Sequence, residues 1–115
     1  MKPWGRILML RCVVDSTEED AQMYAVIGQV KLISDRRDEA LKLIKERGEA
    51  MVRGLTGSRG GYWARPLDGD IQHSFWLFDT EENARAAAEM FGKGPPPGAP
   101  ATLVSVELCE VVGAA

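Results

Sequence analysis

The chain has 115 residues, of which 45% are hydrophobic and 27% charged, and its formal net charge at pH 7 is −3. This length suits one domain with a single modest core. The acidic balance argues against nucleic-acid binding, which needs a basic surface. No apolar run approaches the roughly 20 residues of a membrane span. We therefore expect neither a nucleic-acid partner nor a membrane partner.

The two cysteines, Cys12 and Cys109, fit no metal-ligand spacing. We expect both to be reduced thiols buried in strands. Reduced cysteines are typical of the cytoplasm, where disulfides are rare, and the protein is expected there. The apolar run at 7–10 is too short for the core of a signal peptide, and Arg11 follows it.

The first 22 residues differ in pattern from the rest. Residues 6–14 have the composition of a strand, and 15–20 are acidic and resemble a loop. A more regular pattern begins at Met23. We expect a compact domain over 23–115 and an N-terminal extension over 1–22, which is either an added edge strand or a disordered arm.

A strand and a helix are expected next. Residues 24–33 are apolar apart from Gln29 and Lys31, which is typical of a central strand. Gly28 within it either allows a backbone or ligand to approach closely or marks a bulge. Ser34 or Asp35 is the expected N-cap of the following helix. The apolar stripe of that helix comprises Leu41, Ile44, Gly48, Met51 and Leu55.

A hairpin over 61–79 is the best-defined element. Asp68-Gly69 is a tight-turn signal, since Gly accepts a positive φ without a Cβ clash. The flanks are aromatic and β-branched, as is typical of strands. The glycine-rich stretch 56–61 before the hairpin lacks the Lys-Ser/Thr of a phosphate-binding loop. We interpret this stretch as a flexible loop.

A second helix and a last strand complete the pattern. Thr80 is the expected N-cap of a helix that runs to about Phe91, with alanines on its inner face. The Pro/Gly-rich segment 93–100 can only be a connector. In the last strand, over 102–112, one face is expected to carry Val104, Val106, Leu108 and Val112.

From Met23 the element order is β-α-β-β-α-β. This order predicts an α+β, ferredoxin-like fold: a four-stranded antiparallel sheet with both helices on one face. The strands nevertheless carry apolar residues on both faces. A single chain would leave a large apolar sheet face in water, and such patches mark interfaces. We therefore expect a homodimer packed sheet to sheet.

Four segments carry a resemblance to a known family: 23–25, 52–61, 75–84 and 104–111. Together they resemble the dimeric α/β-barrel superfamily, and most closely its antibiotic-biosynthesis-monooxygenase-like domains. The resemblance covers about residues 23–112. It implies a dimeric barrel of two sheets with a pocket between sheet and helices in each subunit. Some members oxidise polycyclic aromatic substrates with O2 and without metal or flavin, and others degrade heme.

Five residues are candidates for a site that takes a small aromatic ligand without a metal or cofactor. His73 is a candidate base at neutral pH or a hydrogen-bonded strand histidine near the dimer seam. Arg65 is a candidate catalytic cation or a surface or intersubunit ion-pair partner. Trp63 and Trp76 bind the ligand or belong to the core or interface. Gln29 orients a ligand or pairs across the sheet.

Heme cleavage is disfavoured by comparison with the same superfamily. Its heme degraders use an Asn on the first strand, a Trp on the second helix and a His after it. Gln29 lies near the Asn position, but the helix 80–91 has no Trp and no His follows. Two hypotheses therefore remain, a cofactor-independent monooxygenase for an aromatic substrate and a non-catalytic ligand-binding or regulatory homodimer.

Overall fold

A computed structural model describes residues 22–115. The predicted extension lies outside these residues except for Gln22, and so does Cys12. The elements in chain order are β1 (Tyr24–Leu32), η1 (Ser34–Arg36), α2 (Arg37–Leu43), η2 (Ile44–Gly48), α3 (Glu49–Arg53), β2 (Ser58–Ala64), β3 (Ile71–Phe78), α4 (Glu81–Gly92) and β4 (Ala101–Glu110). No helix in this part of the chain is long and apolar enough to cross a membrane.

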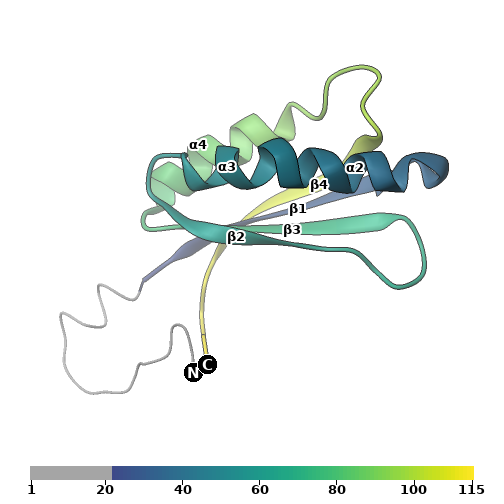
Figure 1. Cartoon of the computed structure of the whole chain (residues 1–115). Coiled ribbons are helices and arrows are strands. Elements are labelled where there is room, and N and C mark those ends of the chain that lie inside the picture. Colours follow the sequence, from purple (N-terminus) through teal and green to yellow (C-terminus); the bar gives the residue numbers. More distant parts are fainter. Residues whose placement is uncertain (1–21) are drawn as a thin grey trace.

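The four strands form one antiparallel sheet in the order β2-β3-β1-β4. Both helical layers, α2 to α3 and α4, lie on the same side of this sheet (Figure 1). This arrangement confirms the predicted ferredoxin-like α+β fold. No helix of residues 22–115 lies on the other sheet face, and we call it the open face.

The core occupies one end of the space between helices and sheet. Phe78, Val26 and Val52 are its largest fully buried side chains, and Ala84 and Ala87 bring α4 close to the strands. The cap of α4 is as predicted, because the backbone N–H of Asn83 donates to Thr80 Oγ1 at 3.1 Å. Gly69 has the predicted positive φ, +94°. The predicted tight turn is wrong, because the connection between β2 and β3 is a longer loop over 65–70.

Two further predictions about local structure were wrong. Ser34 does not cap the first helix; its Oγ donates to Asp70 Oδ2 at 2.7 Å, and the helix begins through a 3₁₀ turn without a side-chain cap. The stretch read as a flexible loop contains the start of β2, since Ser58 already pairs with Phe78. Glycines at 60 and 61 weaken a strand signal, but pairing with the aromatic β3 outweighs their propensity.

The apolar stripes were only partly predicted. A β-bulge at Val104 shifts the register, so that Val30 pairs with Leu103 while Gln29 pairs with Ser105. Leu103 therefore joins the helix-facing side, whereas Val104 is half exposed. On the first helix, Leu41 and Met51 are also well exposed, because this part of the helical layer stands over cavities and not directly on the sheet.

Candidate functional site

The larger cavity, of about 680 Å³, lies between the sheet and the helical layer, beyond the end of the core. Its floor is the helix-facing side of β1 and β3, including Val30. Its walls come from α2 to α3, from the end of α4 and from the segment 94–101. The Pro/Gly-rich connector predicted for that segment is thus a wall of the cavity.

Three consecutive helix-facing residues of β3 meet this cavity with polar groups. Gln72, Ser74 and Trp76 are only 6%, 3% and 5% exposed. Within residues 22–115, the fully buried Trp76 Nε1 has no hydrogen-bond partner, and neither Gln72 nor Ser74 has a side-chain partner. Buried polar groups in native proteins are almost always paired with protein, water or ligand. The cavity therefore offers hydrogen-bonding groups that the protein itself leaves unused.

Aromatic rings form another part of the lining of the larger cavity. The Trp63 and Trp76 rings lie 6.5 Å apart at 64°, and the Trp76 and Phe91 rings 4.9 Å apart at 65°, both edge to face. Gly28 makes the second contact possible, since a Cβ there would lie 2.2 Å from Phe91 Cζ. Gly28 was expected to admit a backbone or a ligand or to mark a bulge, but the group that approaches it is the Phe91 side chain, and the register shift lies at Gln29/Val30.

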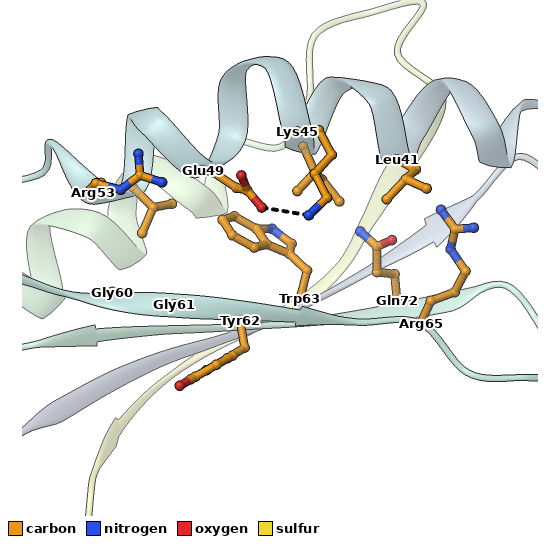
Figure 2. A pocket seen from close by; sticks show the side chains of 12 residues that line it. Leu41, Lys45, Glu49, Arg53, Gly60, Gly61, Tyr62, Trp63, Arg65 and Gln72 are labelled. Carbon is orange, nitrogen blue, oxygen red and sulfur yellow. Dashed lines mark hydrogen bonds and ion pairs between the residues drawn. The ribbon is translucent and has the colours of Figure 1, made fainter. Parts of the chain in front are cut away.

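A smaller cleft of about 470 Å³ lies beside the first cavity, between β2 and the helix above it. Figure 2 shows the Trp63 indole rising from β2 towards the Lys45–Glu49 ion pair, in which Nζ and Oε2 are 3.1 Å apart. Tyr62 points to the opposite side of the sheet. Ile44, Trp63 and Gln72 line both cavities. The two cavities are therefore adjacent and share part of their lining.

The structure separates the five candidate residues. Trp63 and Trp76 line the larger cavity, and Arg65 lines the smaller cleft. Gln29 and His73 face the open side, where Gln29 Nε2 and His73 Nδ1 are 3.4 Å apart and Ser105 Oγ donates to Gln29 Oε1 at 3.4 Å. The expectation that these polar groups converge with the tryptophans on one enclosed pocket is therefore wrong, because strand alternation sends them to opposite faces.

Two residues of the site were not among the candidates, Gln72 and Ser74. Both share a face with Trp76 by strand alternation, and the predicted topology puts helices over one face. Polar residues at two successive positions facing a helical layer are unusual in a core. These two polar residues beneath a helical layer were therefore the signal from which a cavity could have been predicted.

The rim of the larger cavity carries an ion pair. Arg36 donates to Glu39 through Nε at 2.8 Å and Nη2 at 2.7 Å. These bonds lower the pKa of Glu39, which lines the cavity, and raise that of Arg36. Glu39 is consequently ionised at neutral pH. Among residues 22–115, no group of three His, Cys, Asp or Glu side chains is placed to hold a metal ion.

No protein-family model and no curated protein matches the sequence. Solved structures do match. The heme-degrading protein MhuD of Mycobacterium tuberculosis, with two hemes bound in its active site, superimposes with a TM-score of 0.64 at 21% identity over 80% of this chain and 98% of that one. Its heme-free form gives 0.57 at the same identity, over 81% and 98%. A monooxygenase from the ActVA-Orf6 gene of Streptomyces coelicolor, in complex with nanaomycin D, gives 0.50 at 13%, over 85% and 93%.

The chain has the fold of these ligand-binding proteins. The resemblance to the antibiotic-biosynthesis-monooxygenase-like domains is thereby confirmed at the level of the fold. The position of this chain's histidine limits the acid–base chemistry available at the larger cavity. His73 is the only histidine of the sequence and lies across the sheet from the larger cavity, so this chain's own imidazole does not reach a molecule bound there.

Proposed function

We propose that this protein is a homodimer that binds a planar aromatic small molecule in the larger cavity. The observation that carries the proposal is a row of three buried residues with polar groups on β3, Gln72, Ser74 and Trp76, in a cavity lined by aromatic rings. Among the described residues, Gln72 and Ser74 make no side-chain hydrogen bond, and Trp76 Nε1 is buried without a partner. Small-molecule sites combine mostly apolar walls with a few polar groups that fix orientation. The titratable side chains at this cavity, Glu39 and Arg47, come from the helical layer and not from the strands that form its floor. A binding function thus fits the geometry better than acid–base catalysis.

The dimer forms through the open face. That face carries Ile27 on β1, Phe75 and Leu77 on β3, and Tyr62 on β2, whose side chain is 70% exposed in the single chain. Two of its polar members, Gln29 and His73, already pair with each other, and Ser105 and Glu107 lie opposite Gln29 and Ile27 on the same face. A second copy of the same surface would bury the apolar residues without leaving Gln29 and His73 unpaired. The part of the chain that the structure describes places no helix over this face.

The ligand proposal is tested by calorimetric titration with 2-naphthol, a fused-ring alcohol that fits an aromatic cavity and can pair with β3. We expect binding, and we expect Trp76→Phe to weaken it several-fold, because the variant keeps a ring but loses the Nε1 donor. Ser74→Ala should also weaken it. The matched control is Ser105→Ala, which removes a strand serine from the open face. Equal effects of the two serine variants, or no binding of 2-naphthol, would contradict the proposal.

A second candidate function is oxidation of such a ligand by O2 without a cofactor. Trp76 Nε1, Ser74 Oγ and the Gln72 amide would stabilise a substrate anion, which is how hydrogen-bond donors promote such reactions. Because His73 is remote, the substrate has to enter as its anion or lose its proton to solvent. Oxygen-electrode measurements with 1,5-dihydroxynaphthalene test this function. Uptake that exceeds the protein-free rate and falls in Trp76→Phe supports it, and uptake equal to the protein-free rate rejects it for this substrate.

A further inference from the structure

Arg65 and Gln72 lie side by side at the end of the hairpin. Ala64 pairs with His73 across β2 and β3, and Arg65 and Gln72 are the next residues on each side. Strand alternation turns both towards the helices, and Figure 2 shows both rising from the sheet into the smaller cleft. Directly opposed residues have Cβ atoms about 5 Å apart, so the two side chains can contact one group together.

The Arg65 guanidinium is held in place but is not neutralised. Its Nη2 donates to the backbone oxygen of Arg37 at 3.0 Å. The nearby carboxylate, Asp70, is occupied by Arg37, whose Nη1 lies 3.1 Å from Oδ1 and 3.0 Å from the backbone oxygen of Gly69. Within the described residues Arg65 has no carboxylate partner of its own. One nitrogen therefore fixes its orientation while the others remain available.

Gln72 supplies the second half of the site. Its side chain is 6% exposed, has no partner within residues 22–115 and lines both cavities. A guanidinium beside an amide presents several N–H donors to one acceptor, and charged hydrogen bonds of this kind hold carboxylates well. Lys45 and Arg53 also line the cleft, against a single carboxylate from Glu49. The local charge favours an anion.

The position of Trp63 defines the rest of the ligand. Trp63 lies on β2 opposite Ser74 of β3, and Arg65 follows it by two residues, just past the end of β2 at Ala64. Two residues along a strand advance about 6.8 Å. An anion between Arg65 and Gln72 thus lies about that far from the ring wall formed by Trp63 and Trp76. This spacing suits a carboxylate attached directly to a fused pair of aromatic rings.

We propose that the ligand is a planar aromatic carboxylate, with the carboxylate bound by Arg65 and Gln72 and the rings against Trp63 in the larger cavity. This inference rests on the proposed function, because it names the ligand class of the same site. It assigns the smaller cleft to recognition of charge and the larger cavity to recognition of the ring.

The test compares 2-naphthoate with 2-naphthamide, a neutral molecule of nearly the same shape, by calorimetric titration. We expect the wild-type protein to prefer the carboxylate at least about tenfold, and Arg65→Gln to lose that preference while still binding the amide. Retained binding of the amide shows that the variant is folded. The matched control is Arg59→Gln, which removes an exposed β2 arginine that does not line the cleft and should keep the preference.

The outcomes separate the two proposals. Equal binding of both molecules by the wild-type protein, or an unchanged preference in Arg65→Gln, would overturn the carboxylate assignment and leave the aromatic cavity intact. Failure of both molecules to bind at millimolar concentration would overturn the carboxylate assignment and count against the proposed function as well.

Discussion

The two faces of the sheet differ most along β3. Its helix-facing residues run from Gln72 and Ser74 to Trp76 and Phe78, so that half of them are polar. Its open-face residues are Ile71, His73, Phe75 and Leu77, of which three are apolar. For a strand in a single-chain α+β protein the expected order is the reverse, with apolar residues under the helices and polar residues in water.

This inversion indicates what each face is for. The helix-covered face has a real core only at the Phe78 end, where Val26 and Val52 pack. At the other end it carries the polar side chains of Gln72 and Ser74, which have no side-chain partner within residues 22–115 and would gain hydrogen bonds from the proposed ligand. The open face carries the apolar surface that a protein partner would bury. The comparison supports the proposal of a small molecule at one face and a second subunit at the other.

The largest effect is expected from a substitution on the open face that weakens dimerisation. Tyr62→Glu should weaken dimerisation at least about a hundredfold, because burying an uncompensated charge costs about 3 kcal/mol or more. Tyr62 is 70% exposed in the single chain, so the monomer should stay folded. Sedimentation velocity measures the change. Leu67→Glu, at a fully exposed hairpin position, is the control and should leave the dimer intact. A wild-type protein that is monomeric at micromolar concentration would refute the dimer.

On the helix-covered face, the largest effect is expected at Gly28. The Cβ of Gly28→Ala would collide with the Phe91 ring, and such overpacking typically costs about 1–3 kcal/mol in the free energy of unfolding. Urea unfolding provides the measurement. In the control, Gly92→Ala, the new Cβ would meet Val106 at an ordinary 3.7 Å, and the helix should gain slightly. Similar values for both variants would mean that Phe91 does not pack on β1 as described.

The cap of α4 should matter less. Thr80→Ala removes the acceptor of the Asn83 N–H and should lower the free energy of unfolding by about 1 kcal/mol. Thr80→Ser keeps the acceptor and is the matched control. If the two substitutions cost the same, the capping bond contributes nothing and α4 is held on the sheet by side-chain packing alone.

Ser74→Ala should hardly destabilise the ligand-free protein. A buried hydroxyl with a partner loses about 1 kcal/mol on removal, but Ser74 has no partner within residues 22–115, so its loss should be neutral or slightly stabilising. Urea unfolding without ligand gives the value. A loss above 1 kcal/mol would show that the hydroxyl is already bonded and is not reserved for a ligand.

The smallest effect concerns pH. Glu39 has a pKa below its ordinary value because Arg36 binds the charged form. Its contribution to stability is therefore present above the ordinary carboxyl pKa and disappears as the pH falls through the lowered one. Both side chains are exposed, so the contribution is small. Melting temperatures of Glu39→Gln should match those of the wild type at low pH and lie slightly below them at neutral pH. The opposite order would contradict the assigned shift.

The fold could be predicted because local signals agreed with it. Asp68-Gly69 indicated the connection of the hairpin, and Thr80 indicated the start of α4. Strand alternation placed Trp76 on the same face as Gln72 and Ser74. The bulge at Val104 could not be foreseen, since it depends on pairing with β1 and not on local composition. Residues of an interface and residues of a ligand site both appear in the sequence as apolar strand positions, so the sequence does not distinguish them. Gln29 and His73 were therefore candidates together with Trp63 and Trp76, although alternation along the strand already puts His73 and Trp76 on opposite faces.

The central claim is that the helix-facing groups of β3 bind a ligand. The most direct test is a titration of ¹⁵N-labelled protein with 2-naphthoate, in which the indole N–H signals of the tryptophans are followed by NMR. Both tryptophans line the cavity, so the indole signal of Trp76 is expected to shift strongly on binding and that of Trp63 to shift with it. Binding that leaves the Trp76 indole signal unmoved while residues of the open face respond would contradict the account.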